Sequence, residues 1–137
     1  MAITKSTVSA GTSFTPNYTR VRKHATQTDA IIIEDVTGGQ FNNEASGQPI
    51  WLKITTGGTV DVLSSAPGGV TAFTPDHSDW SNSRVYAKGD EVLITRYPSE
   101  PITDFSNARE ATQYSLGSSD TLYLKIDHTA NTLTTYE

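Results

Sequence analysis

The chain has 137 residues, a length that fits one domain with a moderate core and is short for two. Apolar residues make up 35%, charged residues 18% and serine plus threonine roughly a quarter, with a net charge of -5. The chain has no cysteine, which excludes disulfides, thiolate metal sites and cysteine nucleophiles, and no apolar run is long enough for a membrane-spanning helix.

The first 28 residues differ from the rest in charge and texture. They contain four basic residues and no acidic one, whereas the other 109 residues hold 6 bases and all 15 acids. They contain no continuous apolar stretch of the kind found in a signal peptide. Their apolar residues also do not recur with the period of 2 of a strand or the period of 3.6 of a helix. We therefore expect residues 1–28 to form an extended basic N-terminal arm and residues 29–137 to form a β-domain. Such an arm either lies on an acidic protein surface or remains a solvated tail.

Strand patterns begin at residue 30. Residues 31–36 form a β-branched run that ends at Gly38-Gly39, and residues 50–55 and 60–63 alternate on either side of Gly57-Gly58. The second pattern predicts a hairpin. Residues 64–83 predict mostly loop, with only residues 70–73 suited to a short strand.

Two further hairpins are expected in the second half. Residues 84–87 and 91–97 flank a Lys-Gly-Asp turn, and residues 121–126 and 132–136 flank a five-residue loop. Between them, residues 104–116 predict the single short helix, with a C-terminal glycine at position 117.

These patterns predict an all-β protein, a small antiparallel β-sandwich or barrel with the extended N-terminal arm and at most one short helix. No internal repeat is visible. The expected core is apolar and alternates along the strands: Ile31, Ile33, Val36, Ile50, Leu52, Ile54, Val60, Val62, Val92, Ile94, Leu122, Leu124, Ile126 and Leu133.

No motif for catalysis or cofactor binding is found, so we expect no enzyme activity and no cofactor. The Asp76-His77-Ser78-Asp79 segment superficially suits a metal or a general base, but its spacing is generic and predicts a polar turn, so no metal site is expected. There is no Gly-x-Ser-x-Gly elbow, and the Gly-Gly pairs lack the lysine and helix of a phosphate loop. Asn17-Tyr18-Thr19 matches the N-glycosylation acceptor pattern. Because no secretory signal is seen, we interpret this match as accidental.

The basic stretch, residues 20–24, is the expected partner-binding segment. The candidate residues in it and just before it combine aromatic and cationic side chains: Phe14, Tyr18, Arg20, Arg22 and Lys23. Three bases in an acidic protein make a weak footprint for phosphates, so a protein partner is preferred to nucleic acid.

Residues 80–92 carry a Trp followed by a Tyr-x-x-Gly-Asp-x-Val turn. This segment is similar to the opening of small chitin- and cellulose-binding modules, where aromatic residues stack on sugar rings, although the aromatic-rich strand that follows in those modules is missing here. The resemblance implies a carbohydrate-binding alternative through Trp51, Trp80 and Tyr86, provided that they lie exposed on a sheet. Otherwise Tyr86 and Val92 are core residues of a hairpin.

The chain as a whole resembles capsid decoration (cement) proteins of tailed bacteriophages. The shared texture is a Met-Ala start, no cysteine, an acidic β-body rich in Ser, Thr and Gly, and a leader suited to lying along a partner. The resemblance implies a non-enzymatic virion protein, made in the host cytoplasm, that binds the major capsid protein or another virion protein, with a homotrimer preferred to a monomer. The alternative is a carbohydrate- or receptor-binding module of a tail or head fibre. Neither implies contact with nucleic acid or a membrane.

Overall fold

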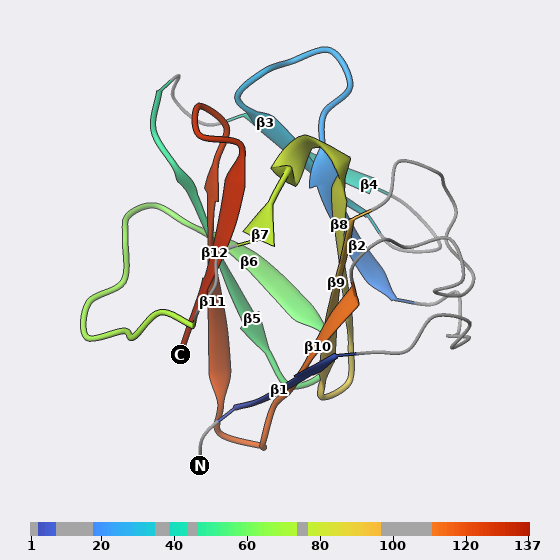
Figure 1. The fold of residues 1–137 in the computed structure, drawn as a ribbon, viewed down its shortest axis with the longest axis vertical. Coiled ribbons are helices and arrows are strands. Elements are labelled where there is room, and N and C mark those ends of the chain that lie inside the picture. The colour runs from blue at the N-terminus through green and yellow to red at the C-terminus, as the bar shows by residue number, and fades with distance from the viewer. Residues whose placement is uncertain (1–2, 8–17, 35–38, 44–46, 74–76, 97–110) are drawn as a thin grey trace.

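The computed structural model contains two antiparallel β-sheets that face each other as a sandwich (Figure 1). It describes residues 3–7, 18–34, 39–43, 47–73, 77–96 and 111–137. No helix in these ranges is long and apolar enough to cross a membrane. The predicted all-β sandwich is confirmed, and the two sheets do not close into a barrel.

The larger sheet has seven strands, which come from both halves of the chain. Its strand order is β1 (Thr4–Thr7), β10 (Ala111–Ser115), β9 (Glu91–Arg96), β8 (Ser83–Lys88), β2 (Thr19–Lys23), β3 (Ala30–Glu34) and β4 (Gly39–Asn43). The smaller sheet has five strands, in the order β6 (Thr59–Leu63), β5 (Ile50–Thr55), β11 (Thr121–Asp127), β12 (Thr132–Tyr136) and β7 (His77–Ser78).

All three predicted hairpins are present. They are β5–β6, β8–β9 and β11–β12, each antiparallel. The first two turns meet at the same end of the sandwich, where the Gly57 N–H donates to the Gly89 carbonyl at 2.7 Å. The Gly58 backbone has φ +76°, which suits a residue without a side chain in a tight turn.

The core lies between the two sheets, because strand alternation points one face of each sheet inward. Every predicted core residue within the described ranges is buried, except Val60 and Val62, which are half-buried against the core. Val36 lies outside the described residues. The core also contains residues that the sequence patterns did not single out: Ile3, Val21, Trp80, Val85, Ala87, Tyr114 and Leu116.

The separate N-terminal arm is a wrong prediction for the described part of residues 1–28. Strand β2 lies inside the seven-stranded sheet, paired with β3 on one side and β8 on the other, and β1 pairs with β10. Val21 in the middle of β2 is fully buried. The segment is therefore integral to the β-domain, and the boundary at residue 29 does not separate two parts.

Three local predictions are also corrected. Residues 111–115 of the predicted helix form strand β10, because they pair with β9 and bury Tyr114 against the facing sheet; residues 104–110 lie outside the described residues. In the predicted polar turn, His77–Ser78 form β7 on β12, and the short helical turn η1 (Trp80–Asn82) follows. The suggested strand at 70–73 forms only a bridge, between Ala72 and Tyr136.

Candidate functional site

The predicted partner-binding residues lie on or beside β2, but they do not share one face. Arg20 and Arg22 lie on the outer face of the seven-stranded sheet, opposite to Val21, whose side chain enters the core. By the same alternation, Lys23 belongs to the face of Val21 at the end of the sandwich, and it is half-buried. Phe14 lies outside the described residues. The basic stretch is therefore divided by the pleat of the strand.

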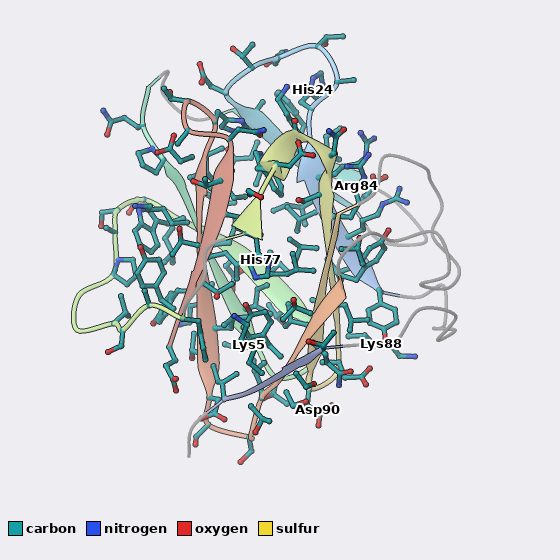
Figure 2. The ribbon with its side chains drawn as sticks, viewed as in Figure 1. Lys5, His24, His77, Arg84, Lys88 and Asp90 are labelled. Atoms are coloured by element: carbon teal, nitrogen blue, oxygen red, sulfur yellow. The ribbon has the colours of Figure 1, made fainter. Side chains whose placement is uncertain are left out.

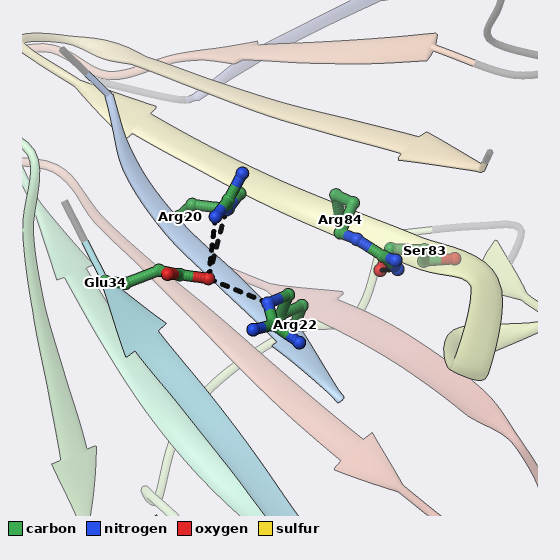
Figure 3. Close-up of polar contacts among 5 residues, drawn as sticks. All are labelled: Arg20, Arg22, Glu34, Ser83 and Arg84. Atoms are coloured by element: carbon green, nitrogen blue, oxygen red, sulfur yellow. Dashed lines mark hydrogen bonds and ion pairs between the residues drawn. The ribbon is translucent and has the colours of Figure 1, made fainter. Parts of the chain in front are cut away.

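An ion-pair cluster joins β2 to β3 on this outer face (Figure 3). Glu34 Oε1 accepts from Arg22 Nε at 2.7 Å and lies 2.8 Å from Arg20 Nη2. Burial raises the pKa of the Glu34 carboxyl, but the hydrogen bonds and charges of Arg22 and Arg20 outweigh that effect and lower its pKa. One carboxylate thus serves two guanidinium groups.

A third guanidinium lies on the neighbouring strand. Arg84 lies on the outer side of β8 (Figure 2), and its Nη1 donates to the Ser83 carbonyl at 2.8 Å. Burial lowers the pKa of Arg84, and the positive charges of Arg22 and Arg20 act in the same direction. Among the described residues, Arg20, Arg22, Glu34 and Arg84 thus bring three guanidinium groups and one carboxylate together, and we call them the arginine cluster.

An apolar row continues from the cluster to the sheet edge. Arg22 lies opposite Ile32 on β3, and Ile32 lies opposite Phe41 on β4. Phe41 is 46% exposed, the only large apolar side chain so exposed among the described residues, and its ring lies 4.7 Å from that of His24. The outer face thus places a guanidinium, a half-buried aliphatic and an exposed aromatic side chain in line across three strands.

Tyr18 is part of the packing and not of the exposed surface. It is 7% exposed, its hydroxyl donates to Glu91 at 2.9 Å, and its ring meets Tyr86 edge-on at 6.2 Å. Burial, together with the hydrogen bond and charge of Glu91, raises the pKa of the Tyr18 phenol. Tyr18, which was expected among the partner-binding residues, therefore packs at the start of β2 with little of its ring exposed.

Two of the three predicted sugar-stacking residues are buried. Trp80 lies in the core, and Tyr86, on the same outer face as Arg20, is only 4% exposed, so neither residue of the 80–92 segment offers an open ring. Trp51 is half-buried on the outer face of the five-stranded sheet, with its ring 5.1 Å from that of Tyr136. Trp51 is thus the single candidate of the three that solvent reaches.

Sequence patterns did not identify Glu34, Phe41 or Arg84 as part of a site. Their positions follow from strand pairing, since β8 and β2 are neighbours although more than 60 residues separate them. The alternation of Arg84 with buried Val85 was a visible signal that this arginine faces outward, but its neighbour across the sheet cannot be read from the sequence.

The structure offers no assembled metal centre in the ranges that it describes. No group of three or more His, Asp or Glu residues in those ranges is placed to hold a metal ion. His77 Nε2 lies 2.8 Å from the Tyr114 hydroxyl, which is 2.9 Å from Thr135 Oγ1, between the two sheets. Two members of this hydrogen-bonded chain, Tyr114 and Thr135, are buried.

Comparison with known proteins gives no relatives from which a role can be inferred. No family model, no curated protein and no solved structure matches the chain.

Proposed function

We propose that the chain is a non-enzymatic virion protein of the capsid decoration type, which attaches to the major capsid protein of an icosahedral phage shell. It attaches through the outer face of β2, β3 and β4, at Arg22, Ile32 and Phe41. The homo-oligomeric state and the virion location belong to the same proposal. The single observation that carries it is the alignment of these three side chains across neighbouring strands.

The chemistry of this row suits a protein partner. Arginine and aromatic side chains are the residue types that contribute most to protein interfaces, and an aliphatic neighbour excludes water from them. Arg22 uses Nε for Glu34, and no hydrogen bond among the described residues engages its two terminal nitrogens. A carboxylate of the partner would find a planar pair of donors there.

The Arg22 guanidinium favours an acidic partner surface. A carboxylate of the partner at its terminal nitrogens would place a second negative charge on this guanidinium beside that of Glu34. Exposed ion pairs contribute about 0 to 1 kcal/mol each, so Ile32 and Phe41 would supply most of the contact and the charges would set its orientation.

The test is cosedimentation with empty shells assembled from the capsid protein of the same virus. Arg22→Glu should weaken binding severalfold, and more so at low ionic strength, where screening is slight. Lys125→Glu is the matched control, since Lys125 is a half-buried lysine on the outer face of the other sheet and its replacement changes the net charge equally. Equal binding by Arg22→Glu and wild type, or no binding by wild type, would contradict the proposal.

A second candidate function is carbohydrate binding through Trp51 and Tyr136. Their rings lie 5.1 Å apart on the solvent side of the five-stranded sheet, and aromatic faces of this kind stack on sugars. Retention on insoluble chitin or cellulose that Trp51→Ala abolishes, without binding to shells, would favour this function over attachment.

A further inference from the structure

We propose that β4 is a self-pairing edge, and that two copies of the chain join their seven-stranded sheets through β4 in antiparallel register about a two-fold axis. Phe41 of one copy then lies opposite Phe41 of the second copy. This interface does not depend on attachment to a shell, so it can be tested in its absence.

The four sheet edges differ in how well they are protected against pairing. Proteins protect edge strands with charges, with bulges or by making the strand short. Edge β1 carries Lys5, edge β6 carries the exposed Asp61 at its centre, and edge β7 is only two residues long. Edge β4 has five residues, Gly-Gln-Phe-Asn-Asn, with no charge and no proline.

Strand β4 is the last strand of its sheet in the part of the chain that the structure describes, where it pairs only with β3. A groove of about 330 Å³ lies between β4 and the facing edge β6, lined by Ile33, Phe41, Asn42, Val60, Asp61 and Val62. Among the described residues, the side chains of the two sheets therefore leave a gap along this side of the sandwich, and the exposed Phe41 contributes to its lining.

The sequence of β4 is complementary to itself in one register. An antiparallel pairing centred on Phe41 places Gln40 opposite Asn42 and Gly39 opposite Asn43 of the second copy. No charge meets a like charge, and the two aromatic residues form a direct cross-strand pair, which stabilises antiparallel sheets. A second copy of this chain is therefore the occupant that the edge fits best.

Two-fold pairing has a consequence for the outer face. Because Arg22, Ile32 and Phe41 lie in line across β2, β3 and β4, the second copy continues the row in the opposite order on the far side of the axis. The pairing gives a dimer and not the trimer that the family resemblance implies. One five-residue strand is a small interface, so a weak dimer is expected, with a dissociation constant of micromolar order or above.

Sedimentation equilibrium of the full chain tests the interface. Between about 10 and 500 μM, wild type should move from one chain of 14.8 kDa towards twice that mass. Phe41→Glu and Phe41→Lys should each remain monomeric, because like charges would face each other across the axis, and an equal mixture of the two should dimerise again. Rescue by mixing is specific for the register, since it requires position 41 to meet position 41.

Thr59→Glu is the control variant, because Thr59 is exposed on the rival edge β6. It should dimerise as wild type does. A monomeric wild type at the highest concentration, a trimer, a dimer that persists in Phe41→Glu, or a mixture that fails to restore association would each overturn the proposal. Circular dichroism confirms that the variants are folded, which is expected because Phe41 is outside the core.

Discussion

The hydroxyl of Tyr114 on β10 and the hydroxyl of Thr135 on β12 are hydrogen-bonded at 2.9 Å, across the interior of the sandwich. Both residues are buried, and the Tyr114 hydroxyl also meets His77 Nε2 at 2.8 Å. Polar groups in a core are costly unless they are paired, so this contact fixes the relative position of the two sheets at that point.

Tyr114→Phe should therefore destabilise the protein by about 1 to 3 kcal/mol, since it leaves the buried Thr135 hydroxyl without this partner. Urea denaturation measures the effect. Tyr123→Phe, on the outer face of β11, is the control and should change the free energy of unfolding by less than about 0.5 kcal/mol. Equal effects of the two variants would contradict the role of Tyr114.

The turn between β5 and β6 permits a second comparison. A Cβ at position 58 would lie 3.1 Å from the Ala87 carbonyl oxygen and 3.1 Å from the Lys88 Cα, whereas a Cβ at position 57 would meet nothing within 4 Å. Both glycines have positive φ, so both substitutions by alanine carry a strain of about 1 to 2 kcal/mol. Gly58→Ala should cost at least about 1 kcal/mol more, measured by denaturation. Equal losses would contradict this difference and would show that the backbone at Ala87 and Lys88 shifts at little cost.

The sequence predicted those parts of the fold that are local. Each hairpin was found because its two strands and turn lie within about 15 residues, and alternation within them identified the core. Strand β2 was missed because its partners are set by the whole sheet, and its alternation of arginine and valine was taken for a basic arm. The helix prediction failed at residues 111–115 because pairing with β9 overrode a helical spacing of apolar residues.

The candidate site was predictable only as residue types. Arg20 and Arg22 were selected for their charge, but their carboxylate partner on β3 and the exposed Phe41 on β4 enter through pairing geometry. Trp80 shows the converse limit, because the sequence cannot tell whether a tryptophan after a polar loop enters the core. Its indole is fully buried beside His128.

Deletion of residues 1–24 provides a direct test of the integral β2 strand. It would remove β1 and β2 and separate β3 from β8. The truncated chain should lose cooperative thermal unfolding and the dispersed amide spectrum of a folded domain. A truncated protein that folds like the full chain would restore the interpretation of this segment as an arm.

Glu34→Gln should destabilise the protein by about 1 kcal/mol at neutral pH, because the two ion pairs are partly exposed and three arginines would then lie together. The folded-state pKa of Glu34 is below its ordinary value of 4.5. Its ionisation therefore stabilises the fold above pH 4.5, and this contribution is lost as the pH falls through the lowered pKa. Denaturation curves between about pH 5 and pH 2 should show a shallower acid loss in Glu34→Gln. An unchanged slope would contradict the assignment.

His128 should introduce a second pH dependence, of different origin. Its two ring nitrogens are buried without a hydrogen-bond partner among the described residues, as is the indole nitrogen of the neighbouring Trp80. Burial lowers the pKa of His128 below its ordinary value of 6.5, and Lys23 acts in the same direction, while Asp29 and Asp127 oppose it. The folded protein therefore holds this imidazole neutral at a pH where the unfolded chain protonates it.

The sign of the effect follows from proton uptake. Below pH 6.5 the unfolded chain binds a proton that the folded chain does not. The free energy of unfolding should therefore decrease as the pH is lowered from 6.5, and it should level off below the lowered pKa of folded His128. Urea denaturation at several values from about pH 7.5 to pH 5 measures this slope. His128→Phe should flatten it, because a phenyl ring replaces the imidazole and has no nitrogen to protonate. An identical slope in wild type and His128→Phe would exclude His128 as the source.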